Sequence, residues 1–371
     1  MGRSARQNGN KRSSVSGSGS LGEAFRNFQS FRITDKEGVN HSFNLGNYVT
    51  ILPHGHRPGT PIEEWQYWVG KITAIHAPHD STDAESDDVR VEVLWYYNAK
   101  DASQTIKSFK ASAVSSFERI LSETKDFVDV QAFNATVPVI AFHEDDHLAP
   151  YIPWDSFFCR YTFEKQMRAI QPKPGTAVCN CHQPYNPNDS SLSSLMHFCP
   201  TSGCRRAYHQ RCLLKTPTPG DLPPALLLAT SPFDDKGLDS DLGGPLRKRR
   251  RSGRLSSQTA IVSEEERLRS LTKALADLPE DLVEVAQQPM VRGAAFQEGG
   301  VSGNIGFVTR AREIVYDFLE SGNVPESWES AVFEPLKPGV QKGAIRNAIV
   351  RIGGLKSGLP RFACPTCHSA I

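Results

Sequence analysis

Closely spaced cysteine and histidine residues constrain this chain more than any other feature of its sequence. Seven of the eight cysteines follow residue 178, and together with one histidine they form four short pairs: Cys179 and Cys181, Cys199 and Cys204, His209 and Cys212, Cys364 and Cys367. Thiolate sulfur and imidazole nitrogen are the ligands that tetrahedral zinc prefers. Eight such ligands predict two closed, structural zinc sites rather than an open catalytic one. Buried apolar cysteines, the alternative, would not fall into pairs.

The order of the ligands distinguishes between two cross-braced zinc folds. A RING finger places its histidine fourth, whereas here the fourth ligand is Cys204 and the fifth is His209. Phe362, two residues before Cys364, also suits the aromatic core position of a PHD finger. The segment therefore resembles a PHD finger. The alternating pairing of that family implies one zinc on Cys179, Cys181, His209 and Cys212, and a second on Cys199, Cys204, Cys364 and Cys367.

Aromatic residues gather in two strand-like runs ahead of the cysteines. Val89, Val91, Val93, Trp95 and Tyr97 alternate along one run and should share a strand face, and Tyr67 and Trp68 belong to the other. Aromatic side chains at a strand end can form an open cage that holds a quaternary ammonium by cation–π attraction. Strand aromatics also commonly belong to the core. The pattern alone leaves both interpretations open.

A family resemblance favours the cage. The runs Tyr67–Ile72, Val93–Tyr97, Asp129–Gln131 and Phe158–Tyr161 resemble a bromo-adjacent homology (BAH) domain, and Cys179–Asp189 resembles the start of the finger in BAH–PHD proteins. This histone-reader family includes the plant short life and early bolting in short days proteins and the fungal effectors of Polycomb repression. The resemblance implies that the BAH domain reads trimethylated lysine 27 of histone H3. The matching positions are Trp68, Trp95 and Tyr97, with Asp101 as an added carboxylate.

The finger of the plant relatives reads trimethylated lysine 4 of the same histone. Tyr185 and Met196 match two of its cage positions, but Ala207 stands where the family has a tryptophan. The missing tryptophan removes the best cation–π surface. Reading of lysine 4 by this finger is therefore the weaker expectation.

The predicted fold is multidomain. A mostly-β, barrel-like BAH domain precedes a cross-braced two-zinc PHD finger, which carries a small all-α insertion between Cys212 and Cys364. Helical periodicity predicts helices from Ser263 to Leu278, from Ala311 to Leu319 with an end at Gly322, and from Ala344 to Ile352. We expect a disordered basic arm at 1–30, the BAH domain at 40–168, the finger at 176–212 and 360–371, a linker at 213–255 and the helical insertion at 260–355.

Charge and hydropathy narrow the range of partners. The chain has 42 Lys and Arg against 41 Asp and Glu, which argues against a polybasic binder of nucleic acid. The basic run Arg247, Lys248, Arg249, Arg250 and Arg251 predicts a nuclear-import signal or a contact with DNA phosphate, or else a solvated charge run. No apolar stretch approaches the ~20 residues of a membrane helix, and no secretory signal begins the sequence. We expect an intracellular protein with no membrane and no small-molecule substrate.

These features predict a non-catalytic reader in the nucleus that binds the histone H3 tail in nucleosomes and contacts subunits of repressive complexes. The alternatives are a reader of another H3 mark through the finger, a scaffold subunit, and a ubiquitin or SUMO ligase that uses the finger as an adaptor. The ligand order at Cys204 and His209 argues against the ligase.

Overall fold

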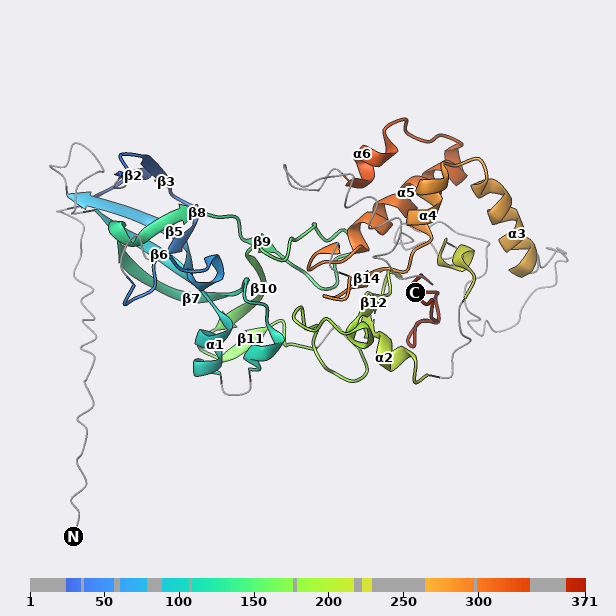
Figure 1. Cartoon of the computed structure of the whole chain (residues 1–371), viewed down its shortest axis with the longest axis horizontal. Coiled ribbons are helices and arrows are strands. Elements are labelled where there is room, and N and C mark those ends of the chain that lie inside the picture. Colours follow the sequence, from blue (N-terminus) through green and yellow to red (C-terminus); the bar gives the residue numbers. More distant parts are fainter. Residues whose placement is uncertain are drawn as a thin grey trace, which may run out of the picture.

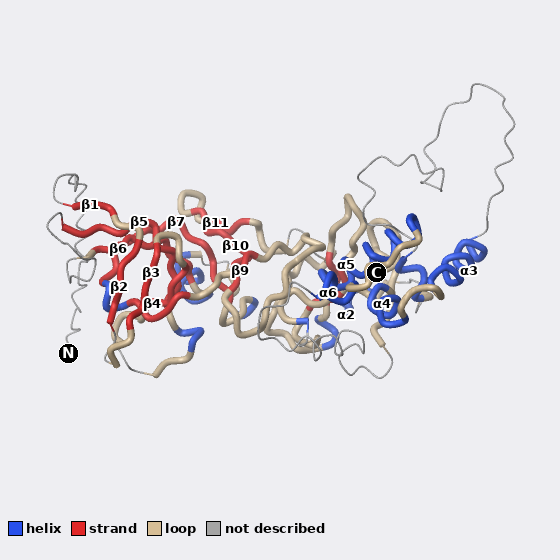
Figure 2. The backbone as a smooth tube through the Cα atoms, turned by 90° about the horizontal axis from the view of Figure 1, so that it is seen from above, coloured by secondary structure: helices blue, strands red, loops and turns tan. Residues whose placement is uncertain are grey.

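The computed structural model forms two lobes, one built from strands and the other from the finger and the helices (Figures 1 and 2). The bridge between the lobes includes β9 and β10 (Figure 1). The structure describes residues 25–34, 37–56, 61–78, 89–106, 109–175, 179–216, 222–228, 264–296, 299–333 and 358–371.

A nine-stranded sheet forms the first lobe within the described residues, in the order β11-β10-β7-β6-β5-β4-β8, with β1 on β5 and β9 on β10. Its strands are β1 (Phe25–Asn27), β4 (Tyr48–Ile51), β5 (Trp68–Pro78), β6 (Arg90–Tyr97), β7 (Glu118–Asp129), β8 (Phe133–Thr136), β9 (Ile140–Ala141), β10 (Phe158–Glu164) and β11 (Ala169–Gln171). The hairpin β2 (Ser30–Thr34) and β3 (Asn40–Asn44) adds a separate two-stranded sheet. The mostly-β character expected for this region is confirmed.

The predicted alternation holds along most of β6. Val89, Val91 and Val93 are buried in one core cluster with the aromatic rings of the β2–β3 hairpin. Past Val93 the register with β7 shifts, and Tyr96 becomes more buried than its neighbours. Trp95 and Tyr97 are half-buried at the end of the strand, and Trp95 still packs against the core cluster that contains Val93.

The N-terminal boundary of the sheet differs from the expected one. An arm to residue 30 and a domain from residue 40 were predicted, but Phe25–Asn27 forms β1 on β5 and β2 begins at Ser30. Phe31 is buried and stacks on Phe43 with ring centroids 5.1 Å apart. Apolar residues at intervals in this polar segment therefore join the fold through contacts that its composition does not reveal. At the other end, β11 extends the sheet past the expected residue 168.

Short elements build the second lobe around the cysteines. They are β12 (Met196–Phe198), β13 (Ala207–His209) and α2 (Gln210–Leu213), with the C-terminal segment returning beside them (Figure 1). Phe362 and Ile371 exchange backbone hydrogen bonds of 2.8 Å in both directions, which closes the last loop. The ring of Phe362 meets His197 edge-on at 4.9 Å, so this aromatic residue lies in the core of the finger.

The insertion is mainly helical but not all-α. It contains α3 (Glu264–Leu275), α4 (Glu280–Ala286), β14 (Val291–Arg292), α5 (Ile305–Ser321) and α6 (Trp328–Phe333). The helix expected to end at Gly322 is confirmed, because Gly322 caps α5 at a positive φ of 75°. Helix α3 confirms the core of the first predicted helix, and the third, 344–352, lies outside the described residues. Strand β14 was not predicted, because two residues show no periodicity.

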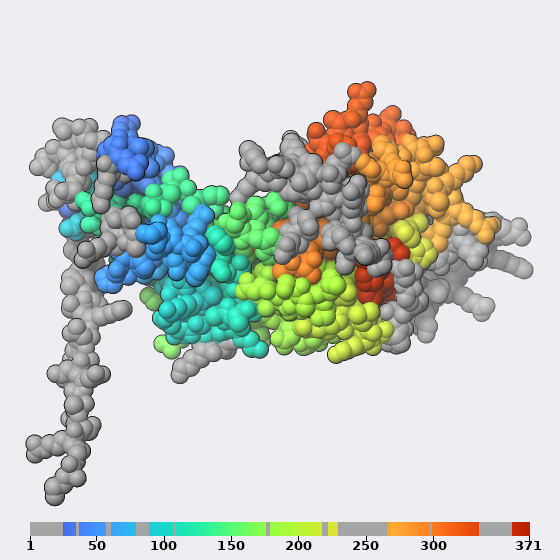
Figure 3. Space-filling model, viewed as in Figure 1, coloured from blue at the N-terminus to red at the C-terminus, as the bar shows by residue number. Residues whose placement is uncertain are grey.

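One hydrophobic core joins the insertion, the finger and the end of the β-sheet lobe. It includes Phe142 and Ile152 from the first lobe, Met196 from the finger, and Val291 and Val308 from the insertion. Part of the expected linker also belongs to this core, since Leu228 is 3% exposed. The space-filling view shows the insertion and the finger as one continuous body (Figure 3). None of the helices in the described residues is both long enough and apolar enough to span a membrane.

Candidate functional site

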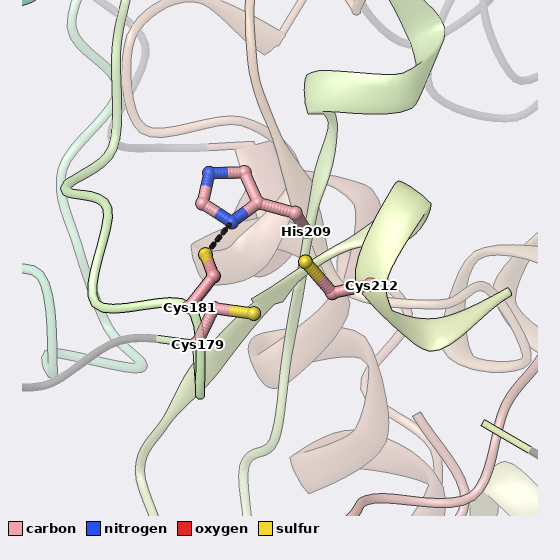
Figure 4. A group of neighbouring side chains, drawn as sticks. All are labelled: Cys179, Cys181, His209 and Cys212. Atoms are coloured by element: carbon pink, nitrogen blue, oxygen red, sulfur yellow. Dashed lines mark hydrogen bonds between the residues drawn. The ribbon is translucent and has the colours of Figure 1, made fainter. Parts of the chain in front are cut away.

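Four of the predicted metal ligands converge at the first site. Cys179, Cys181, His209 and Cys212 place their ligand atoms within 4.8 Å of one another. Their side chains point toward a common centre from the loop before β12, the end of β13 and helix α2 (Figure 4). The Cys181 Sγ lies 3.4 Å from the His209 Nδ1. This grouping is the set that the finger resemblance implies.

The other four ligands form the second site. Cys199, Cys204, Cys364 and Cys367 also lie within 4.8 Å of one another. The sulfurs of Cys199 and Cys367 are 3.4 Å apart, and those of Cys204 and Cys364 are 3.7 Å apart. A tetrahedron with Zn–S bonds of about 2.3 Å has edges of about 3.8 Å, so the sulfur spacing suits a four-coordinate ion. Both groups could therefore hold a metal ion.

Burial makes ionisation of one thiol in each group depend on a compensating cation. Burial and neighbouring sulfurs raise the pKa of Cys204 and the pKa of Cys212 to about 11. Such thiols remain protonated at neutral pH unless a positive charge compensates the thiolate. A bound divalent ion supplies that charge, so metal binding and closure of the finger are coupled.

Two tryptophans meet at the rim of the β-sheet lobe. The rings of Trp68 and Trp95 cross at 83° with centroids 5.6 Å apart. Trp95 faces Gly70 across the β5–β6 pair, and Gly70 has no side chain between the two indoles. Trp68 opens β5 and is 36% exposed, so one indole of this pair faces solvent. Two perpendicular indoles, one partly exposed, can form two walls of a cage.

Tyr97 lies at the same strand end but has partners of its own. Its ring approaches Phe163 at 6.2 Å, and its hydroxyl donates to the Thr124 Oγ1 at 2.8 Å. These contacts fix the orientation of Tyr97 beside the tryptophan pair. The structure thus brings Trp68 and Trp95 together, with Tyr97 near the same strand end and tied to its own neighbours.

Asp101 lies in the first turn of α1 (Ala99–Thr105), which Asn98 caps by accepting the Asp101 amide at 2.9 Å. Burial raises the pKa of the Asp101 carboxyl, against the opposing attraction of Arg119. Because the Asp101 carboxylate is half-buried, its negative charge is poorly solvated. An external cation beside it would stabilise the ionised form.

Sequence reasoning missed Arg119, which holds the backbone just before Trp68. This arginine is 1% exposed and donates to the carbonyl of Trp65 at 2.7 Å and to that of Tyr67 at 3.3 Å. Burial lowers the pKa of Arg119 to about 10, although Asp101 opposes the shift. Its guanidinium also lies 4.6 Å from the centroid of the Phe157 ring. Arg119 is a positioning residue for the Trp68 rim, and a single arginine in a strand gives no sequence signal for this.

The two finger residues matched to a second cage are buried. Tyr185 is 1% exposed and Met196 is 0% exposed. The guanidinium carbons of Arg160 and Arg292 lie 5.5 Å and 5.1 Å from the centroid of the Tyr185 ring. In this arrangement Tyr185 already contacts two cations of its own chain, and it offers no ring face to a histone peptide.

Those arginines belong to a buried ionic network that sequence reasoning also missed. Arg160 pairs with Glu118 at 2.8 Å and with Glu144 at 2.8 Å, and Arg292 reaches the other Glu144 oxygen at 3.2 Å. The network connects the β-sheet lobe to the insertion, with Tyr185 of the finger accepting from Arg160 through its carbonyl at 3.0 Å. The basic run at 247–251 lies outside the described residues.

Comparison with known proteins finds similarity to chromatin proteins over about half of the chain. No family model matches the chain. It is 27% identical over 175 residues to the chromatin remodeling protein SHL of Arabidopsis thaliana, covering 47% of this chain and 66% of the relative. It is 25% identical over 177 residues to the chromatin remodeling protein EBS of the same plant, covering 48% of this chain and 65% of the relative. The alignments thus span just under two thirds of either relative.

The chain is similar to BAH–PHD chromatin proteins. Among solved structures, the yeast Rsc2 BAH domain aligns with a TM-score of 0.25 at 11% identity, covering 43% of this chain and 59% of that one. The sheet-rich first lobe and the two cysteine-rich groups are the two parts that the sequence resemblance to BAH–PHD proteins predicts. The insertion between Cys212 and Cys364 contacts both parts of this chain.

Proposed function

We propose that this chain is a non-catalytic chromatin reader whose BAH domain binds trimethylated lysine 27 of histone H3 in Polycomb-type transcriptional repression. The observation that carries the proposal is the perpendicular pair of Trp68 and Trp95, 5.6 Å apart, with Trp68 partly exposed at the rim. Both plant relatives are named as chromatin remodeling proteins. The family resemblance supplies the choice of lysine 27.

Cation–π attraction supplies the chemistry of recognition. A trimethylammonium group has no hydrogen to donate, so aromatic faces within ≈ 6 Å of its charge bind it better than polar groups do. In this proposal the indoles of Trp68 and Trp95 form two walls and Tyr97 forms a third. The hydroxyl of Tyr97 donates to Thr124 and its ring packs beside Phe163, which fixes the orientation of this third wall.

Asp101 adds the one negative charge of the proposed site. Its poorly solvated carboxylate attracts the ammonium or a neighbouring basic residue of the histone tail. The rest of the peptide would lie along the rim, where its backbone and flanking residues determine which lysine is chosen.

Two zinc ions are proposed for the finger, in a structural role. All eight ligands are cysteine or histidine, and each group contributes four, which fills a tetrahedral shell and leaves no open position. The proposed partners are the histone H3 tail in nucleosomes and subunits of repressive complexes. The basic run from Arg247 to Arg251 is proposed to direct nuclear import or to contact DNA phosphate.

Calorimetric titration of the full, zinc-loaded chain tests the proposal. The ligands are histone H3 peptides centred on lysine 27, unmodified and trimethylated, and a peptide with a neutral tert-butyl isostere in place of the trimethylammonium. We expect binding of the trimethylated peptide alone. Trp68→Ala should weaken that binding about 10-fold, since a desolvated cation–π contact contributes up to about 2 kcal/mol.

Phe127→Ala is the matched control. Phe127 is also an exposed aromatic of the same sheet, at 48%, but it faces Glu92 toward the opposite end of β6. Its loss should leave binding unchanged. Equal binding of the neutral isostere would contradict the cage, and absence of binding with intact chromatin association would favour the scaffold role.

A further inference from the structure

The free edge of the finger's hairpin is covered by a segment of the insertion. Strand β14 pairs antiparallel with β12, which places Arg292 opposite Met196 and Val291 opposite His197. The amide of Phe198 donates to the carbonyl of Met290 at 2.8 Å. An exposed sheet edge is the usual docking place for an extended peptide, which adds to it as a further strand. Here the chain itself provides that strand (Figure 1).

The side chain of Arg292 extends from this strand into a cation-binding site formed by Glu144, Tyr185 and Phe142. It donates to the Glu144 carbonyl at 2.8 Å and pairs with the Glu144 carboxylate at 3.2 Å. The guanidinium carbon also lies 5.1 Å from the Tyr185 ring centroid and 5.6 Å from that of Phe142. A carboxylate together with two aromatic rings is the chemistry that binds the basic side chain of a peptide.

The rest of the insertion holds β14 against the finger. The Val291 amide donates to the Asn304 Oδ1 at 2.7 Å, and the Asn304 amide donates back to the Val291 carbonyl at 3.0 Å. Gly303, at a φ of 71°, leaves room for this strand, because a Cβ there would lie 1.9 Å from the Val291 oxygen. Val291 and Arg292 are both 0% exposed.

We propose that the β12 edge, with Glu144, Tyr185 and Phe142, is a binding site for an extended peptide carrying a cationic side chain, and that residues 290–292 occupy it as a built-in ligand. The finger of this chain therefore reads its own insertion instead of a histone tail. The inference stands apart from the proposed role of Trp68 and Trp95, which lie in the other lobe.

Opening the edge tests the proposal in the full, zinc-loaded chain. Gly303→Ala forces the Val291 carbonyl away and should expose β12. Gly322→Ala is the matched control, since Gly322 has a similar φ of 75° but a Cβ there meets nothing within 4 Å. The probes are histone H3 peptides of residues 1–15, with lysine 4 unmodified or trimethylated, and hydrogen exchange follows residues 196–198.

In wild type and Gly322→Ala, we expect a slowly exchanging Phe198 amide and no response of residues 196–198 to either peptide. In Gly303→Ala, the Phe198 amide should exchange faster than in wild type. This variant should bind the peptide at least about 10-fold more tightly than wild type does, and bound peptide should restore protection of the Phe198 amide. Adding Glu144→Gln to Gly303→Ala should reduce this increase in affinity. Fast exchange of Phe198 in wild type, peptide-induced protection of 196–198 in wild type, or an opened edge that binds no peptide would each overturn the proposal. If Gly303→Ala fails to fold, the exchange of the Phe198 amide in wild type can still contradict the proposal. The titration with lysine 27 peptides tests the other lobe, so its result does not depend on this experiment.

Discussion

Arg160 and Glu118 form a bidentate ion pair that is wholly shielded from solvent. The Arg160 Nε donates to one carboxylate oxygen at 2.8 Å and its Nη2 to the other at 3.0 Å, with side-chain exposures of 1% and 0%. The pair connects β10 to β7, which run parallel at this point. It lies beneath the contact between the two lobes, where Arg160 also binds Glu144 and the Tyr185 carbonyl.

Breaking this pair should strongly destabilise the protein. Glu118→Gln leaves the buried charge of Arg160 with less compensation, so we expect a loss of about 3–5 kcal/mol in the free energy of unfolding. Glu92→Gln is the matched control, because Glu92 pairs with Lys125 at 3.0 Å on the surface, where exposures are 24% and 50%. That substitution should cost about 0.2–1 kcal/mol. Urea unfolding measures both, and equal losses would contradict the role given to burial.

Loss of Arg119 should loosen the backbone before Trp68. Arg119→Lys cannot bond the carbonyls of Trp65 and Tyr67 with the same geometry, and a buried unsatisfied carbonyl costs about 1–3 kcal/mol. We expect faster hydrogen exchange of the Gln66 and Tyr67 amides and weaker peptide binding, with the sheet intact. Arg90→Lys, at an exposed arginine of β6, should change neither. Unchanged exchange at Gln66 and Tyr67 would show that Arg119 does not position this rim.

Asp101 makes binding depend on pH in a defined direction. Burial raises its pKa, so the folded protein binds a proton there at a higher pH than the unfolded chain does. The ionised carboxylate therefore costs stability at neutral pH, and the stability of wild type relative to Asp101→Asn should rise as pH falls through the raised pKa. Peptide affinity should move the opposite way, falling as the carboxylate is protonated. Asp101→Asn should bind the peptide more weakly at neutral pH, and its affinity should no longer depend on pH. Peptide titrations from about pH 7 to about pH 4 measure this. A pH dependence that survives the substitution would contradict the role given to Asp101.

Metal content should follow the two ligand groups separately. Replacing Cys364 and Cys367 by serine should remove one of two zinc ions and release the C-terminal segment, because that site joins residues 358–371 to β12 and its loop. Metal analysis and limited proteolysis measure these effects. Cys159→Ser is the control, since Cys159 is a free cysteine outside both groups, and its zinc content should stay at two. Loss of both ions from the double variant would mean that the sites are not independent.

Ligand type and spacing were enough to predict that the chain holds two metal sites. Four short pairs of cysteine and histidine can satisfy tetrahedral coordination only by combining, and the resemblance to a PHD finger supplied the alternation that the structure has for Cys179 with His209 and Cys199 with Cys364. Period-two alternation likewise predicted the buried face of β6 as far as Val93. Both patterns involve residues close together in the chain and recur at regular spacing, so they can be recognised from the sequence alone.

Tertiary structure alone decided how these parts meet. The buried ionic network joins residues that are far apart in the sequence: Glu144, Arg160 and Arg292. No local sequence pattern indicates their partners. They pair because a charge buried in the core needs an opposite charge beside it. The two residues of β14 have no periodicity of their own and become a strand because β12 offers unpaired backbone groups. The exposure of Trp68 and the burial of Tyr185 also follow from packing: two aromatic residues that the sequence matches to cage positions are partly exposed in one lobe and fully buried in the other.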